Sequence, residues 1–176
     1  MQKKGDIWIS AILYFGLGIV VISILLAAGL PVINKLKDKN IVIQSKQVMH
    51  ILDQNIREVL REGPGSQRLV SINVKKGNLI VDAQHDVLAW SYDGAHVLIS
   101  EPGLLVPEGN LNILTNTTQQ KGIYNISILA NYASIANINR PAGSQNTLLG
   151  LTDLVVRNEG LDAQQKIMVS ISEANR

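Results

Sequence analysis

The chain has 176 residues, of which 46% are hydrophobic, and a formal net charge of +2. This charge is too small, and its lysines and arginines are too scattered, to predict a nucleic-acid-binding surface, so nucleic acid is not an expected partner. The chain has no cysteine, which excludes disulfide frameworks, thiolate metal sites and cysteine nucleophiles.

The first predicted element is an apolar helix. Between Ile7 and Ile33 there is no charged side chain. A helix of this length measures about 40 Å, more than the roughly 30 Å of a bilayer's hydrocarbon core. Trp8 and Tyr14 are aromatic residues of the kind found at membrane interfaces. The segment therefore predicts one membrane-spanning helix rather than a buried core helix, which rarely stays uncharged for so long.

Three uses of this segment remain open. The first is a plain single-span anchor, and the second is a helix retained after a short leader. The third is a secretory signal that is cleaved at the small residues Ala27-Ala28-Gly29. The apolar run is longer than the 7–15 residues of most secretory signals, which disfavours the third use.

Two signals disagree on orientation. The lysines after the helix (Lys35, Lys37 and Lys39) outnumber those before it, which favours a cytoplasmic C-terminal part. Two Asn-x-Ser/Thr acceptors, at Asn116 and Asn125, favour export instead. An exposed polar β face is the alternative explanation for both asparagines.

A short basic leader, Lys3-Lys4-Gly5-Asp6, stands directly before the apolar helix. This layout resembles that of archaeal type IV pilins and archaellins, whose leader is removed by prepilin peptidase. The resemblance covers the arrangement of residues 1–62 and implies cleavage between Gly5 and Asp6. Bacterial pilins usually carry glutamate at the fifth mature position, where this chain has Ser10.

The resemblance also implies partners and a location. The precursor would lie in membrane lipid, and the helix would then self-associate at the cell surface with the help of the pilus assembly machinery. Small residues permit close helix approach. The helix positions implied in membrane and filament contacts are Ile7, Trp8, Ile12, Tyr14, Gly16, Gly18, Ala27, Ala28 and Pro31.

Beyond Pro31, which is expected to kink or melt the helix, an amphipathic helix is predicted. Its apolar stripe comprises Ile41, Val48, Leu52, Ile56 and Val59, widened by Val42, Met49 and Leu60. The charged residues Asp38, Lys46, Asp53, Arg57 and Arg61 are expected mainly off this stripe, with Asp53 and Arg57 as an i,i+4 pair. Glu62-Gly63-Pro64-Gly65 is a stop signal.

From residue 67 the hydrophobic period becomes two, which is typical of β-strands. Turn residues such as Lys75-Lys76-Gly77-Asn78, Asp93-Gly94 and Asn158-Glu159-Gly160 are expected to separate them. The predicted strand pairs are 69–74 with 79–82, 87–92 with 95–100, 110–117 with 122–131, and 148–157 with 166–172. Residues 132–147 are expected to form an exposed loop.

The predicted fold class is therefore α+β, a long N-terminal hydrophobic helix followed by an antiparallel β-sheet or small β-sandwich. The expected divisions are a leader at 1–5, a membrane or filament-core helix at 6–33, an amphipathic spine and stop at 34–65, and a β-rich head at 66–176. Trp90 and Tyr92 share one strand face and are expected in the core.

A catalytic set, a metal site and a cofactor site are not predicted. His85 with Asp82 and Asp86 is the nearest approach to a cluster, but along a strand and turn these side chains need not converge. His50 and His96 lie far from them in the sequence. The expected function is a structural filament subunit; the alternatives are a single-span anchored β domain that binds a partner in the cell envelope and, third, an enzyme.

Overall fold

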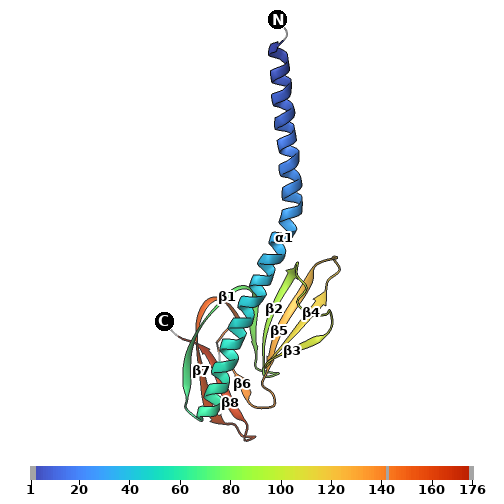
Figure 1. Cartoon of the computed structure of the whole chain (residues 1–176). Helices are drawn as coiled ribbons and strands as arrows, with labels where there is room; N and C mark the ends of the chain where they lie inside the picture. Colours follow the sequence, from blue (N-terminus) through green and yellow to red (C-terminus); the bar gives the residue numbers. More distant parts are fainter. Residues whose placement is uncertain (1–2, 142, 175–176) are drawn as a thin grey trace. The chain divides into compact units, whose positions relative to one another are not determined.

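The computed structural model describes residues 3–141 and 143–174, with helix side chains described from Trp8 onward. One α-helix, α1 (Lys3–Glu62), precedes eight strands in this part of the chain. The chain divides into two compact units, Met1–Lys37 and Asp38–Arg176, which are described separately (Figure 1). The second unit contains the C-terminal half of α1 and the whole sheet.

The sheet is a single layer in the order β3-β4-β5-β2-β1-β7-β8-β6. All its pairings are antiparallel except that of β6 with β8. The strands are β1 (Gln67–Asp82), β2 (Val87–Ala95), β3 (Leu105–Glu108), β4 (Leu111–Thr117), β5 (Tyr124–Asn131), β6 (Asn137–Asn139), β7 (Thr147–Leu161) and β8 (Ile167–Glu173). The predicted α+β fold is confirmed, in its single-sheet form rather than as a sandwich.

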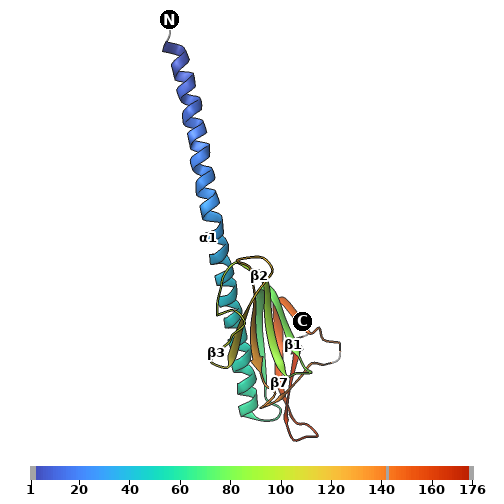
Figure 2. The ribbon, with the colours of Figure 1, turned by 90° about the vertical axis from the view of Figure 1, so that its right-hand side faces the viewer.

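The second layer of this unit is the C-terminal half of α1, which lies along one face of the sheet (Figure 2). The predicted stripe is confirmed, because Leu52, Ile56 and Val59 are at most 1% exposed. Alternate residues of the strands supply the other side of the core, with Trp90 and Tyr92 among them as predicted. The sheet is thus covered on one face by a helix of the same chain.

The two predicted helical segments form one continuous helix, α1, from Lys3 to Glu62. α1 continues through Pro31 without melting. It ends at Glu62 as predicted, where the Gly63 amide donates to the Val59 carbonyl at 3.3 Å. Gly63 has a φ of 94°, a left-handed conformation that glycine adopts without a steric penalty.

The predicted position of two helix residues is wrong. Asp38 and Asp53 are each only 4% exposed, so they lie in the helix–sheet interface and not off the stripe. Their carboxylates accept hydrogen bonds from the sheet and its loops, which makes their burial possible. The predicted ion pair of Asp53 with Arg57 is confirmed, at 2.9 Å.

Three predicted turns are instead irregularities within long strands. β1 runs through Gly77, β2 through Gly94 and β7 through Gly160, each with a shift of register nearby. All three glycines have a positive φ, which a β-bulge can require just as a hairpin turn does. The predicted hairpins of 69–74 with 79–82 and of 87–92 with 95–100 are therefore wrong.

The two remaining predicted hairpins are confirmed as β4 with β5 and β7 with β8, the latter with a longer first strand. The prediction for residues 132–147 is wrong in part. This segment contains β6, and Tyr132, Ala136 and Ile138 within it are buried. The edge strand β3 was not predicted, because it is short and contains Pro107.

The bulge at Gly77 leads to a stability prediction. A Cβ at Gly77 would lie 2.4 Å from the Ser91 carbonyl oxygen, whereas one at Gly94 would meet nothing within 4 Å. Both glycines have similar positive φ values, of 78° and 81°. Gly77→Ala is expected to cost about 2–5 kcal/mol, combining about 1–2 for the left-handed conformation and about 1–3 for overpacking.

Gly94→Ala is the matched control, since it adds only the conformational part of that cost. Urea unfolding of the two full-length variants in detergent measures the difference. Equal losses of stability in the two variants would contradict the close approach of β1 to β2.

Candidate functional site

The most exposed apolar surface belongs to the first unit. From Trp8 to Lys37 every side chain is exposed, and the two half-buried positions are glycines. Trp8 and Tyr14 are each 75% exposed and Ile12 is 67% exposed. Among the described residues α1 is the one helix long and apolar enough to cross a membrane, with a mean hydropathy of 2.6 over its most apolar window. An apolar surface of this size needs lipid or other protein to cover it.

Polar groups inside this segment are compatible with a lipid environment. The Ser23 hydroxyl donates to the Ile19 carbonyl at 2.8 Å, one helical turn earlier. A hydroxyl bonded within its own helix carries no unsatisfied donor into hydrocarbon.

No described residue packs against the glycines of the apolar helix segment. A Cβ added at Gly16, Gly18 or Gly29 would meet nothing within 4 Å. Ala27 and Ala28 are exposed, as is Pro31. The space beside these residues is therefore open to a neighbouring helix. At the predicted leader junction the backbone of Gly5, Asp6 and Ile7 belongs to α1, and the side chains of Asp6 and Ile7 lie outside the described residues.

A polar cluster joins Asp38, the first residue of the second unit, to β2 and the residue that follows it. The Asp38 carboxylate accepts hydrogen bonds from the Tyr92 hydroxyl at 2.8 Å and from the His96 backbone amide at 2.7 Å. The His96 ring nitrogen Nδ1 lies 2.9 Å from the same carboxylate. Lys76 donates to the Tyr92 hydroxyl at 2.9 Å. This cluster holds α1 against the sheet where the head begins.

These contacts determine the pKa of Asp38. Burial raises the pKa of this carboxyl, but the hydrogen bonds from His96 and Tyr92 outweigh it, and its pKa lies below the usual value. The pKa of the Tyr92 hydroxyl is raised, chiefly by burial and further by its bond to Asp38, against the opposing effect of Lys76. The pair is therefore an ionised carboxylate with a neutral phenol as its donor.

Asp38→Asn is expected to lower the free energy of unfolding at neutral pH by about 1.5–3 kcal/mol, the typical value of hydrogen bonds to a charged group. Because the folded-state pKa is lowered, the carboxylate stabilises the fold above its unfolded-state pKa of about 3.9. That contribution is lost as the pH falls through the folded-state pKa.

Urea unfolding of the full-length protein in detergent, followed by tryptophan fluorescence, tests this dependence. The difference between wild type and Asp38→Asn should shrink between about pH 5 and pH 2. Asp93→Asn is the control, because Asp93 is exposed in the sheet. A difference that stays constant across this range would refute the role of the ionised carboxylate.

A second polar cluster surrounds Asp53, further along the buried side of α1. Its carboxylate accepts from Arg57 Nε, from the Asn110 amide at 2.9 Å and from the Tyr132 hydroxyl at 3.0 Å. Burial raises the pKa of Tyr132 above its usual range, and the neighbouring charge of Asp53 adds to the effect. This cluster connects α1 to the loops after β3 and β5.

The helical spacing of the sequence indicates that position 38 lies on the buried face, although the predicted apolar stripe did not include it. One series of helix positions has spacings that alternate between four and three residues, as expected for a single helix face: 38, 42, 45, 49, 52, 56 and 59. All of these residues are at most 8% exposed, including Asp38 and Ser45. The helix period alone places a residue on the buried face, whatever its polarity.

The histidine and aspartate residues near the β1–β2 turn do not form a common site. His85 Nδ1 lies 2.7 Å from Asp82 Oδ2 in the exposed turn. Asp86 instead accepts from the Ile138 amide at 2.7 Å and from Lys166 at 3.2 Å. Within the described residues there is no group of three or more His, Cys, Asp or Glu side chains that could hold a metal ion.

The two candidate glycan acceptors are direct cross-strand neighbours. Asn116 in β4 pairs with Asn125 in β5. Asn116 is exposed, whereas Asn125 is half-buried and its Oδ1 accepts from the Gly94 amide at 3.4 Å. Side chains at directly opposite positions have Cβ atoms about 4.5–5.5 Å apart, too close for two bulky groups. Asn116 is therefore the more accessible of the two.

No protein-family model, curated protein or solved structure matches this chain.

Proposed function

We propose that this chain is a pilin-like structural subunit of an archaeal type IV pilus-like surface filament. The observation that carries the proposal is the contrast between the two parts of α1. Residues 8–37 expose nearly all of their side chains, whereas the stripe from Val42 to Val59 is buried in the head. A subunit that polymerises through one part of a helix and holds its head with the other has this distribution.

In this proposal the precursor stays in the membrane through the apolar part of α1. Assembly then transfers the helix from lipid into a bundle of identical helices. The apolar surface stays out of water throughout, so the transfer does not lose the free energy of apolar burial. Gly16, Gly18, Ala27 and Ala28 would allow neighbouring helices to approach closely.

The proposed processing step follows from the Lys3-Lys4-Gly5-Asp6 sequence. Cleavage after Gly5 by prepilin peptidase would remove the two leader lysines and leave the apolar helix at the new N-terminus. The assembly machinery and the peptidase are therefore the proposed partners of the precursor, and the cell surface is the proposed final location.

N-terminal sequencing of native protein sheared from cells tests the processing step. The mature chain is expected to start at Asp6, and a chain that starts at Met1 in filaments would refute cleavage. Gly5→Val is expected to leave the precursor unprocessed in the membrane fraction, while the conservative control Gln2→Asn is processed normally.

Electron microscopy of the same sheared fraction separates this proposal from a plain anchor. A single-span protein whose β domain binds a partner in the cell envelope would stay with the membranes and form no filaments. Surface export would also expose Asn116 to glycosylation. Mass spectrometry of the mature chain should then find a glycan at Asn116 and an unmodified Asn125.

A further inference from the structure

An exposed leucine-bearing loop connects β2 to β3. Leu98, Leu104 and Leu105 are 49%, 52% and 49% exposed. Single exposed leucines are common on soluble domains. Three of them within eight residues of the sequence are more than a single exposed leucine, and exposed apolar side chains gathered in one segment mark a candidate interaction surface. Residues 96–105, the connection together with the first residue of β3, are called the leucine loop below.

The leucine loop is held in place although its leucines are exposed. Its turn is closed by the Leu104 amide, which donates to the Glu101 carbonyl at 3.1 Å, with Gly103 at a φ of 77°. The Gly103 amide donates to the Thr115 carbonyl at 2.8 Å. The Ser100 hydroxyl lies 2.8 Å from Thr115 Oγ1. Such a loop pays little ordering entropy when it binds a partner.

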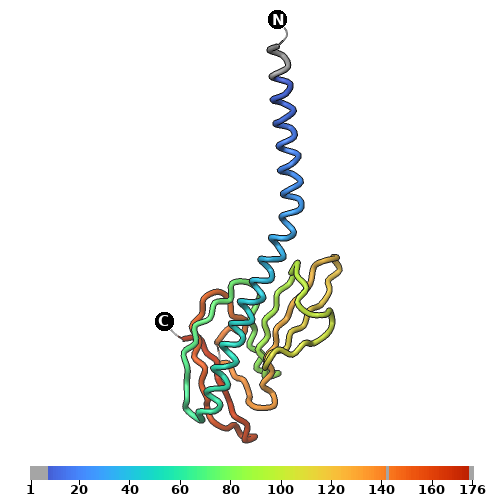
Figure 3. Tube along the Cα trace, in the orientation of Figure 1, coloured from blue at the N-terminus to red at the C-terminus, as the bar shows by residue number. Residues whose placement is uncertain are grey.

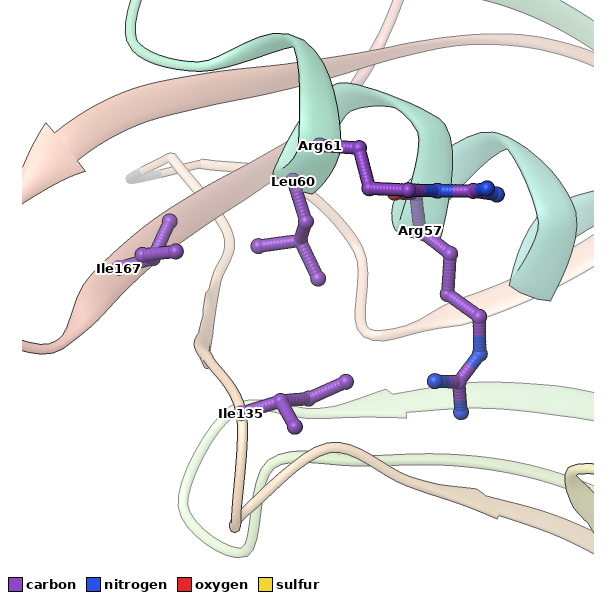
Figure 4. Close-up of a pocket in the computed structure, with 5 residues that line it drawn as sticks. All are labelled: Arg57, Leu60, Arg61, Ile135 and Ile167. Carbon is purple, nitrogen blue, oxygen red and sulfur yellow. The ribbon is translucent and has the colours of Figure 1, made fainter.

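A shallow groove of about 370 Å³ lies near the C-terminal end of α1 (Figure 4). Leu60 from α1, Ile135 from the loop before β6 and Ile167 from β8 form its apolar wall. Arg57 and Arg61 lie along its other side (Figure 4). These five residues are called the basic groove below.

One cation of the basic groove is available to a partner. Arg57 pairs with Asp53 at 2.9 Å. Arg61 donates its Nε to the Arg57 carbonyl at 3.3 Å, and it forms no ion pair with any residue that the structure describes. The groove therefore suits a ligand that combines apolar side chains with one negative charge.

The leucine loop has that composition. Glu101 is exposed beside Leu104 and, within residues 3–141 and 143–174, its carboxylate has no ion pair. The loop leads into β3, at one edge of the sheet, whereas the groove adjoins β8 and the segment before β6 at the other edge. The trace in Figure 3 shows the loop and the end of α1 in different parts of the head. One copy therefore cannot fill its own groove.

We propose that the leucine loop of one copy docks into the basic groove of the next, with Leu104 against Ile135 and Glu101 beside Arg61. Two different surfaces that meet in this way form a heterologous contact, which repeats indefinitely when it does not close into a ring. The inference rests on the proposed filament and adds the contact that sets the register of neighbouring heads, while the apolar helices supply the main association.

The absence of cysteine allows a direct test on the full-length chain. Leu104→Cys and Ile135→Cys are combined in one chain, and filaments sheared from cells are treated with a short bismaleimide crosslinker. A ladder of dimers, trimers and higher species on a denaturing gel is expected. The control is Leu104→Cys with Leu151→Cys, because Leu151 is 66% exposed on the uncovered face of the sheet; this pair should give no ladder.

Charge reversal tests the proposed ion pair. Arg61→Glu and Glu101→Arg are each introduced into the Leu104→Cys/Ile135→Cys chain, and each is expected to reduce the ladder on the order of tenfold, because like charges then meet. The combination of both reversals should restore it. Lys121→Glu, at an exposed turn, is the control and should leave the ladder unchanged.

The outcomes separate this contact from the filament proposal. Filaments without a ladder would refute the head contact and leave the filament proposal intact. A preparation with neither filaments nor a ladder would refute both. Crosslinking of Ile135→Cys to a different protein in place of a second copy would also refute the contact.

Discussion

Arginine in place of Val21 is expected to weaken membrane insertion of the chain and to reduce its incorporation into filaments. Val21 lies in the middle of the apolar run and is 47% exposed, so lipid or neighbouring helices would contact it directly. An arginine at the centre of a membrane helix costs about 2.5–3.5 kcal/mol on insertion scales. A cost of that size lowers the equilibrium constant for insertion more than fiftyfold, since about 1.4 kcal/mol is a factor of ten.

Alkaline extraction of membranes measures this effect, and electron microscopy of sheared fractions measures incorporation. Val21→Leu is the matched control and should behave as the wild type. The head should fold in both variants, because its core is formed by residues from Val42 onward. Normal membrane retention of Val21→Arg would show that the apolar run is covered by something other than lipid.

Alanine in place of Asp53 is expected to destabilise the head by about 2–6 kcal/mol. Leaving the buried Tyr132 hydroxyl without an acceptor costs about 1–3 kcal/mol, and losing the part-buried hydrogen bonds from Arg57 and Asn110 costs about 0.5–1.5 kcal/mol each. Tyr132 would lose its acceptor inside the core, and Arg57 and Asn110 would lose theirs at its edge. Unfolding of the full-length chain in detergent with urea measures the loss. The expected result is a lower midpoint with an unchanged slope.

Two controls define the contribution of burial. Tyr132→Phe removes one donor and should cost about 0.5–1.5 kcal/mol. Lys46→Ala breaks the more exposed ion pair with Glu108 and should cost less than about 1 kcal/mol. A loss for Asp53→Ala no larger than that of Lys46→Ala would contradict the buried acceptor.

The two buried aspartates suggest why the head holds its helix in one position. An apolar stripe alone can slide along a sheet with little change in buried area. Asp38 and Asp53 must both reach specific donors, Tyr92 and His96 in one cluster and Asn110 and Tyr132 in the other. Because an unpaired buried carboxylate is costly, only one register of helix on sheet satisfies both clusters.

The glycine-containing motifs illustrate where prediction from sequence failed. Lys75-Lys76-Gly77-Asn78 and Asp93-Gly94 have the composition of hairpin turns, yet both lie within strands. A positive φ at glycine is equally suited to a turn and to a bulge. The difference lies in the partner: β1 continues past Gly77 because β7 and β2 supply hydrogen-bond partners on its two sides.

The sequence by itself determined the features that depend on local periodicity and length. These are the apolar run from Ile7 to Ile33, the buried stripe of α1, its end at Glu62 and the alternation of the strands. Tertiary structure alone decided which glycines are bulges, that residues 137–139 join the sheet edge, and where the carboxylates of Asp38 and Asp53 find donors. It also decided that Leu60, Ile135 and Ile167 share one groove. Periodicity reports which face of an element is buried, but the partner on that face comes from residues distant in the chain.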